Sequence, residues 1–369
     1  MLLVQTQRDA LLRPLQVVAG IVERRQTLPI LANILLRKQG NSIALISSDI
    51  EIQISTQANI GIGNEDVATT VAARKLLDIL KAVPESENIN LTLADKKLGL
   101  NAGKSKFKLQ TLAAEDFPIA AQPEHYPVSL ELTQKTLRHL FSMVHFSMAQ
   151  QDIRYYLNGL LLATEGQQVK AVATDGHRLA LCSAQVAGAT QPKNDAIIPR
   201  KTVLEMLRLL GEIDEPVQVN IASNQIRFSF NDIELVSKLV EGKFPDFNRV
   251  IPSGYGKTFQ ISRLDLLAAL QRVSILTSDK LRVVRMTFAD NKLLVTSTNA
   301  DQEDAQEELD IEFNYDRVEI GFNVGYLLDV LGNVKNEQVQ ISLGDSNSSA
   351  LITLPGDDSF KYVVMPMRI

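Results

Sequence analysis

The sequence predicts an α+β fold in which three similar domains follow one another along the chain. One pattern of short strand-like segments and amphipathic helices occurs three times, at a spacing of roughly 120 residues. Within each copy, the order of one strand, one helix and three strands occurs twice, which predicts two helices and about eight strands per domain. This order is typical of helices packed on one side of antiparallel sheets.

The first copy begins with an alternating segment that leads directly into a helix at residues 7–22, and a second helix is expected at residues 72–83. Apolar residues recur at helical spacing on the first helix and predict a buried stripe; they are Leu11, Leu12, Leu15 and Val18. The strands expected in this copy are residues 2–6, 30–38, 42–48, 50–56, 67–71, 88–93, 97–102 and 106–112.

The second and third copies have the same order. Their helices are expected at residues 133–146, 200–210, 262–276 and 323–334, and Thr133 and Ser262 stand where a helix N-cap is favoured. The corresponding apolar stripes are Leu137, Leu140, Phe141 and Val144, then Leu266, Leu267, Leu270 and Val273. Proline-rich stretches near residues 117–127 and 251–256 suit linkers. We therefore expect domains at residues 1–122, 127–251 and 257–369.

The charge of the chain is divided unevenly between its helices and the rest. The net formal charge is -5, which by itself speaks against a nucleic-acid partner. The six helix windows (7–25, 73–83, 133–147, 200–211, 262–276 and 323–335) nevertheless carry +9, which leaves −14 elsewhere. Basic helices facing one way would attract phosphates without reading bases. The alternative is that these are ordinary solvated helix faces, and the sixfold repetition favours the first interpretation.

Two segments near opposite ends of the chain carry complementary charge. Residues 301–310 contain six acidic residues, and residues 104–108 read KSKFK, with lysines alternating along a predicted strand. A head-to-tail contact between such segments closes a ring if the angles permit it. The alternative is that both are polar edge strands facing solvent.

The composition excludes several classes of protein. No run of about 18 apolar residues predicts a membrane span, and the first residues lack the basic start of a secretory signal. Cys182 is the one cysteine and has no partner for an internal disulfide, which favours a reducing cytoplasm. None of the four histidines has the spacing of a metal motif, so neither a metal nor a cofactor is expected.

The segment Thr-Asp-Gly-His-Arg-Leu at residues 174–179 is a candidate for catalysis. Asp175 and His177 could act as a base and the residue that orients it, but no nucleophile elbow, phosphate-binding loop or zinc motif accompanies them. We therefore interpret the segment as a turn before a strand and expect no catalysis. The C-terminal residues 362–369 are apolar almost to the end, which indicates a packed segment or an adaptable groove for partner peptides.

Several long motifs resemble the β subunit of bacterial DNA polymerase III, in order and over the whole chain. They are residues 27–36, 72–80, 147–159 (SMAQQDIRYYLNG), 172–180 (VATDGHRLA), 238–247 (KLVEGKFPDF), 320–331 (IGFNVGYLLDVL) and 362–369 (YVVMPMRI). The resemblance implies a head-to-tail homodimeric ring of two three-domain chains, with helices lining a hole and sheets outside. It implies a sliding clamp that holds double-stranded DNA without sequence specificity. Implied partners are an ATP-dependent clamp loader complex, replicative and repair DNA polymerases, and other proteins with a clamp-binding motif.

The resemblance also implies three sets of site residues. The DNA-facing positions are Arg25, Arg74, Gln151, Tyr155, Tyr156 and Lys201. The peptide pocket comprises Leu157, Thr174, Gly176, His177, Arg178, Leu179, Pro245, Arg249, Val250, Asn323, Tyr326, Ser349, Val363, Val364, Met365, Pro366, Met367 and Arg368. The dimer interface comprises Lys75, Lys104, Lys106, Phe107 and Leu109 on one side, and Ile275, Leu276, Glu303, Asp304, Glu307 and Glu308 on the other.

Some residues depart from the pattern of the resemblance. The stretch Glu23-Arg24-Arg25-Gln26 lacks an expected Gly-Gly-Arg-Pro, which leaves open whether Arg24 or Arg25 contacts DNA. A peptide-binding scaffold without a role on DNA remains the alternative function, although it leaves the basic bias of the helices unexplained.

Overall fold

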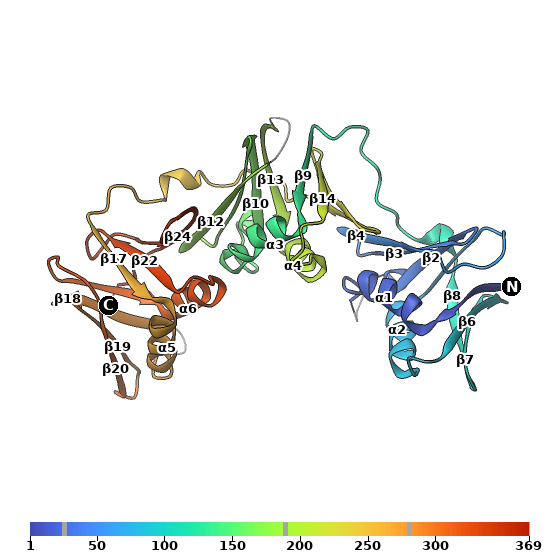
Figure 1. Ribbon diagram of the computed structural model, residues 1–369, viewed down its shortest axis with the longest axis horizontal. Coiled ribbons are helices and arrows are strands. Elements are labelled where there is room, and N and C mark those ends of the chain that lie inside the picture. Colours follow the sequence, from blue (N-terminus) through green and yellow to red (C-terminus); the bar gives the residue numbers. More distant parts are fainter. Residues whose placement is uncertain (24–27, 187–190, 279–281, 369) are drawn as a thin grey trace. The chain divides into compact units, whose positions relative to one another are not determined.

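The computed structural model describes residues 1–23, 28–186, 191–278 and 282–368 (Figure 1). The chain forms two compact units, one made of Met1–Gln134 with Arg208–Leu239 and the other of Lys135–Leu207 with Val240–Ile369. Within the described residues, no helix is both long enough and apolar enough to cross a membrane.

The first unit is built on one twelve-stranded antiparallel sheet, with the order β1-β6-β7-β8-β5-β2-β3-β4-β16-β15-β14-β9. Its strands are β1 (Leu2–Gln7), β2 (Asn33–Gln39), β3 (Ser42–Ser48), β4 (Ile52–Ala58), β5 (Val67–Ala72), β6 (Asn88–Ala94), β7 (Lys97–Ala102), β8 (Ser105–Leu112), β9 (Val128–Thr133), β14 (Pro216–Ile221), β15 (Gln225–Phe230) and β16 (Ile233–Lys238). The first repeat and part of the second therefore share a single hydrogen-bonded ladder.

Two helices of the first unit, α1 (Arg8–Ala19) and α2 (Ala73–Ala82), lie side by side in Figure 1 and contact each other. The predicted stripe of α1 is buried, with Leu11 and Leu15 fully shielded from solvent. The α1 helix also contacts β3 and β4, where the Ser47 hydroxyl donates a 2.6 Å hydrogen bond to the Val18 carbonyl oxygen. Apolar burial of this kind supplies most of the stability of a short helix.

The second unit contains an eight-stranded sheet and a four-stranded sheet, both antiparallel. The larger sheet has the order β13-β10-β11-β12-β24-β23-β22-β17, and the smaller has the order β20-β19-β18-β21. The strands are β10 (Gly159–Gly166), β11 (Gln168–Thr174), β12 (Arg178–Gln185), β13 (Gln191–Pro199), β17 (Lys257–Ser262), β18 (Val283–Ala289), β19 (Lys292–Thr298), β20 (Asp304–Asp310), β21 (Val318–Asn323), β22 (Gln338–Leu343), β23 (Ala350–Leu354) and β24 (Asp357–Val364).

Helices α5 (Arg263–Ser274) and α6 (Val324–Asn333) contact each other in the second unit, which also contains α3 (Gln134–Ser142) and most of α4 (Arg200–Leu209). The predicted N-cap of α5 is confirmed, because Ser262 Oγ accepts the Asp265 N–H at 3.3 Å. Phe259, Phe288 and Phe313 form a three-ring cluster with centroids 5.5 to 5.8 Å apart. Because Phe259 lies on β17 and Phe288 on β18, these rings join the two sheets.

The repeated order predicted from the sequence is confirmed, with local differences. Residues Pro29–Ala32 form a 3-10 turn instead of the start of a strand, since proline fixes φ and donates no ladder hydrogen bond. The predicted helix at 133–146 ends at Ser142 and is followed by a separate 3-10 turn at His145–Ser147. The β4 strand begins at Ile52, because Ile50 has a φ of 79° and cannot extend the ladder.

The polar corner between the second and third strands has the same design in all three repeats. An Asx side chain accepts backbone N–H groups of the residues that follow it: Asp49 from Glu51 and Ile52, Asp175 from His177 and Arg178, and Asn299 from Asp301 and Glu303, at 2.7 to 3.0 Å. After the first two corners, the third strand pairs with the last strand of the next repeat, giving the pairs β4–β16 and β12–β24.

Candidate functional site

A cavity of about 190 Å³ opens beside the β12–β24 pair in the second unit. It is lined by Arg154, Tyr156, Leu157, Thr174, Gly176, His177, Arg178, Leu179, Phe244, Pro245, Phe247, Val250, Val363 and Met365. Most of these side chains are aliphatic or aromatic, and the polar ones come from the corner and from the loop around Arg154. Such a cavity is suited to apolar side chains held in place by a few polar contacts.

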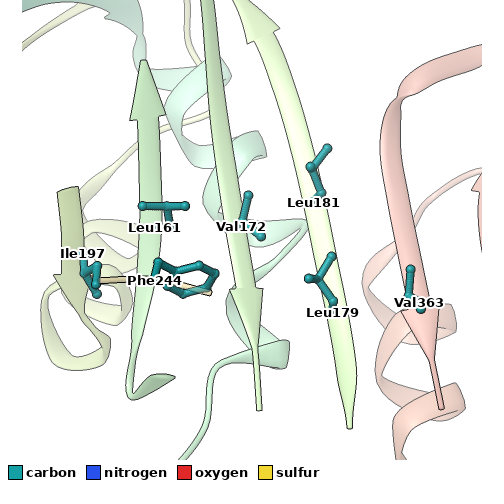
Figure 2. Close-up of a cluster of buried hydrophobic side chains, with 7 residues drawn as sticks. All are labelled: Leu161, Val172, Leu179, Leu181, Ile197, Phe244 and Val363. Carbon is teal, nitrogen blue, oxygen red and sulfur yellow. The ribbon is translucent and has the colours of Figure 1, made fainter. Parts of the chain in front are cut away.

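A buried cluster (Figure 2) contributes Leu179, Phe244 and Val363 to the lining of this cavity. Its members come from four neighbouring strands, from β24 and from the segment after β16, and are Leu161, Val172, Leu179, Leu181, Ile197, Phe244 and Val363. Tyr156, Phe247 and Ile251 pack against it while partly exposed. The segment around Phe244 is therefore held by core contacts, and Pro245 and Phe247 follow it in the cavity wall.

The corner at residues 174–178 forms the polar wall. Thr174 Oγ1 donates to the Arg178 carbonyl at 2.6 Å and accepts the Gly176 N–H at 3.1 Å. Gly176 has a φ of +90°, a conformation that favours glycine. A Cβ at this position would lie 2.9 Å from Nη1 of Arg154, so glycine also allows the arginine to lie against the backbone.

Arg178 anchors the corner from the buried side. Its Nε contacts Asp175 Oδ2 at 3.2 Å, its Nη1 contacts Asp329 Oδ2 at 2.6 Å, and its Nη2 donates to the Phe146 carbonyl at 2.6 Å. The guanidinium also lies over the Tyr326 ring, 4.4 Å from the centroid. Burial lowers the pKa of Arg178, but its neighbours, including Asp329 and Asp175, raise it by more, so the net pKa lies above the ordinary value.

Arg154 covers the corner from the solvent side. Its guanidinium pairs with Asp152 at 2.8 and 3.0 Å and donates to the Asp175 carbonyl at 3.1 Å. The hydrogen bonds from Arg154 lower the pKa of Asp152 to about 2, so this carboxylate is ionised at neutral pH. Two arginines, each held by an aspartate from outside the corner, thus lie on either side of Gly176.

The C-terminal segment is packed against the same region, as its apolar sequence predicts. The Met365 N–H donates to the His177 carbonyl at 2.9 Å, and the Met367 N–H donates to the Gly321 carbonyl at 2.7 Å. Met365 still has 39% of its surface exposed, at the mouth of the cavity. A flexible thioether in this position can adapt to different apolar ligands.

Ten of the eighteen predicted pocket residues line the cavity, namely Leu157, Thr174, Gly176, His177, Arg178, Leu179, Pro245, Val250, Val363 and Met365. Tyr326 contributes beneath it through the ring under Arg178, and Asn323 caps α6 by accepting the Gly325 N–H. The cavity is also lined by Arg154, Phe244 and Phe247, which sequence reasoning missed, and by Tyr156, which was assigned to the DNA-facing positions. The sequence Phe244-Pro245-Asp246-Phe247 places two aromatic residues in an otherwise polar linker, which could have indicated their role in the cavity. No local pattern singled out Arg154.

The geometry offers no catalytic dyad at Asp175 and His177. One Asp175 oxygen accepts two backbone N–H groups and the other contacts Arg178, so the carboxylate is occupied by the turn itself. In the part of the chain that the structure describes, no group of three or more His, Cys, Asp or Glu side chains is arranged to hold a metal. The Cys182 thiol is buried, which raises its pKa to about 12 and leaves it a poor nucleophile.

Two of the strand edges that are open among the described residues carry opposite charges. The β8 strand pairs with β7 from Ser105 to Gln110 and meets β5 only at residues 111–112, and β20 pairs with β19 alone. The β8 edge carries exposed Lys104 and Lys106, with Phe107 and Leu109 half-buried, and Lys75 is exposed on α2. The β20 edge carries exposed Glu303, Asp304 and Glu308. Glu307 pairs with Arg272 of α5, whose end presents Leu276 half-buried and Ile275 with 76% of its surface exposed.

The predicted DNA-facing residues are distributed over both units. Gln151 and Tyr155 are exposed on the loop that carries Arg154, and Lys201 is half-buried at the start of α4. Arg74 is exposed at the start of α2, with one guanidinium N–H donating to the Val22 carbonyl at 2.7 Å. Arg24 and Arg25 lie outside the described residues.

Three family models match the chain, those of the DNA polymerase III beta subunit N-terminal domain at residues 2–121, central domain at 131–246 and C-terminal domain at 248–368. The chain is 45% identical to the beta sliding clamp of Pseudomonas aeruginosa and 42% identical to that of Escherichia coli K12, covering 98% of this chain and 99% of each relative. A solved structure of the sliding clamp from P. aeruginosa bound to griselimycin superposes with a TM-score of 0.96 at 44% identity over the full length of both chains.

Replacing Gly176 by alanine should destabilise the second unit more than replacing Gly166, which also has a positive φ but has open space around its Cβ position. Forcing an L-residue into the left-handed region costs about 1–2 kcal/mol at either site, and Gly176→Ala must also displace Arg154. Denaturant unfolding of the two variants measures the difference. Equal losses of stability in the two variants would show that displacing Arg154 adds no cost at position 176.

Proposed function

Because this chain belongs to the DNA polymerase III beta subunit family, the bacterial sliding clamps, we propose that two copies close head to tail into a ring around double-stranded DNA. A sliding clamp is the processivity factor of the replicase and performs no chemistry itself. The observation that carries the ring is the pair of open, oppositely charged strand edges. Within the chain, the strand after a polar corner pairs with the last strand of the next repeat, as in β4–β16 and β12–β24. Among the described residues, β20 and β8 are the corresponding strands of the third and first repeats that lack this pairing.

The repeat pattern supplies the register of the proposed contact. The β20 strand follows the third polar corner, as β4 and β12 follow the first two, and β8 occupies the place of β16 and β24 as the last strand of a repeat. The hairpin turns before β8 and β16 support the alignment of these two strands. In each turn, the first residue of the strand pairs with the residue three positions earlier, Ser105 with Ala102 and Ile233 with Phe230. A second copy of the chain would therefore add β20 to β8 as an antiparallel neighbour.

Transferring the register of the β4–β16 pair to the open edges sets Asp304 opposite Lys108, Gln306 opposite Lys106 and Glu308 opposite Lys104. All six side chains are exposed, so the register brings together side chains that lie on the same face of the sheet. Lys106 then has Asp304 and Glu308 as its diagonal neighbours, within reach of a long side chain. Opposite charges across this edge favour pairing of the right strands and disfavour pairing of like edges.

Apolar contacts would complete the proposed interface. Phe107 and Leu109 are half-buried on the inner face of β8, and Ile275 is largely exposed at the end of α5, which contacts β20. Burying such side chains contributes about 25 cal/mol per Å² of apolar surface removed from water. Charge pairs at the rim add mainly specificity and association rate.

The proposed contact with DNA is electrostatic and independent of sequence. Arg74, Gln151, Tyr155, Tyr156 and Lys201, with Arg24 or Arg25, are the proposed DNA-facing positions. The basic helices and the acidic remainder of the chain support this assignment, since phosphate contacts give affinity without sequence information. A clamp loader complex must open a closed ring for it to enter circular DNA.

We also propose that the apolar cavity receives the clamp-binding peptides of replicative and repair DNA polymerases and of other partners. Its leucine, valine and phenylalanine side chains and its polar corner support a short peptide with large apolar residues. Griselimycin, which is bound to the P. aeruginosa relative, is proposed to bind this chain as well. The three domains are proposed at residues 1–122, 127–251 and 257–369, and the buried, unpaired Cys182 supports a cytoplasmic location.

Retention on circular DNA tests the ring directly. Loaded onto a nicked circle with a bacterial clamp loader and ATP, the protein should stay bound through gel filtration at about 0.5 M salt, where simple phosphate contacts weaken. It should be lost once the circle is cut linear. Equal retention on circular and linear DNA would rule out topological linkage, and no binding to either would favour the scaffold alternative.

The charge pairing predicts that Lys104→Glu with Lys106→Glu weakens the dimer. The new glutamates would place negative charges opposite the acidic β20 edge. The dissociation constant of the dimer should therefore rise by about tenfold or more at low salt, and by less at high salt. Sedimentation across a dilution series measures it. A matched variant, Lys96→Glu with Lys97→Glu, makes the same change of net charge at an exposed turn. If both double variants dimerise like the native chain, the edge assignment is wrong.

The pocket assignment predicts that removing residues 365–369 abolishes peptide binding and leaves the dimer intact. The deletion takes away Met365 at the cavity mouth and the Met367 hydrogen bond to Gly321. The probe peptide is a fluorescein-labelled hexapeptide with two leucines and one phenylalanine, followed by anisotropy, with sedimentation as the check on assembly. Unchanged affinity for the probe peptide would contradict the assignment.

A further inference from the structure

We propose that Asp329, on helix α6, is a positioning residue of the peptide pocket and acts on it through Arg178. Asp329 does not line the cavity, and its role there rests on the proposed function of the pocket. Helix α6 would thereby shape the polar wall of the site, which belongs to the preceding repeat.

Helix α6 presents two groups to one guanidinium. Tyr326 and Asp329 are three residues apart and therefore lie on the same face of the helix. The Tyr326 ring lies under the guanidinium of Arg178, and Asp329 Oδ2 accepts from its Nη1 at 2.6 Å. Tyr326 is held in turn, because the buried Tyr362 hydroxyl donates to its carbonyl at 2.9 Å. Helix α6 thus supplies two of the contacts that position the guanidinium.

A short series of contacts leads from Asp329 to the cavity. Arg178 uses its Nε to contact Asp175 Oδ2 at 3.2 Å, and the other oxygen of Asp175 accepts the N–H groups of His177 and Arg178. That turn places Gly176 and His177 in the cavity wall. Each contact is charged or holds the backbone, so a change at Asp329 should reach the wall without a change in the core.

Arg178 and Asp329 differ in exposure, and the charge of Asp329 matters because it compensates a buried guanidinium. The Arg178 side chain is 9% exposed, whereas that of Asp329 is 46% exposed. A guanidinium so buried needs compensation by hydrogen-bonded carboxylates, and Asp175 must also serve the turn. Without Asp329, Asp175 would be the remaining carboxylate bonded to Arg178, and the turn that Asp175 holds at residues 175–178 would lose its fixed geometry. The half-exposed aspartate can itself be replaced without opening a cavity.

The test compares Asp329→Asn, which removes the charge and keeps the shape, with Asp329→Glu, which restores a carboxylate. We expect the Kd of the probe peptide to rise about tenfold for Asp329→Asn, as for loss of a charged hydrogen bond. The glutamate variant should recover most of that loss. Asp265→Asn, in the exposed first turn of α5, is the matched control and should bind like the native chain. Sedimentation should be unchanged in all three. Asp329→Asn should also lower the unfolding temperature, because the buried Arg178 loses part of its compensation, whereas the other two variants should unfold like the native chain.

A double-mutant cycle separates positioning from a general structural role. In an Arg178→Ala background, Asp329→Asn should add no further loss of affinity, because its effect passes through the missing guanidinium. An additive loss in that background, or native affinity of Asp329→Asn alone, would overturn the inference. Failure of the native ring to bind the probe peptide would instead overturn the pocket assignment, and the inference with it.

Discussion

Antiparallel pairing across repeats is the constraint on which the rest of the structure depends. A strand edge exposes a row of N–H and C=O groups that must find partners, and each repeat ends in such an edge. The β4–β16 and β12–β24 pairs meet this requirement within the chain. Among the edges that stay open in the described residues, β8 and β20 lie in the first and third repeats and carry opposite charges. The proposed assembly of two chains would thus follow the same rule of pairing as the internal architecture.

The same pairing creates the candidate site. Wherever two repeats join, the polar corner, the end of a strand and the linker between repeats come together and leave a recess. The β4–β16 junction has one of about 270 Å³, lined by Ile50, Pro118 and Lys238. There Ile50 stands where the second junction has Gly176, and Gln53 Oε1 accepts the Ala120 N–H at 2.8 Å. At the second junction, glycine at the corner and phenylalanines in the linker produce a more apolar cavity.

Repetition explains how much could be predicted from the sequence. Strand and helix order followed from alternating and helical spacing of apolar residues, because each element buries one face. The corner at Asp175 was predicted as a turn from its Asp-Gly dipeptide. Arg154 escaped prediction, since its role depends on a loop approaching Gly176 from a distance in sequence. The tie between Arg178 and Asp329, 151 residues apart, likewise has no local pattern, because charged pairs of this kind are set by tertiary packing.

The buried thiol of Cys182 has a practical consequence for work on this chain. It is the one cysteine in 369 residues, and with a pKa of about 12 it forms almost no thiolate at neutral pH. The native sequence therefore already serves as a background for selective labelling. A cysteine introduced at each open edge would be the reactive thiol on its surface, so that a crosslink or a pair of dyes could report opening of the proposed ring in real time without prior removal of native cysteines.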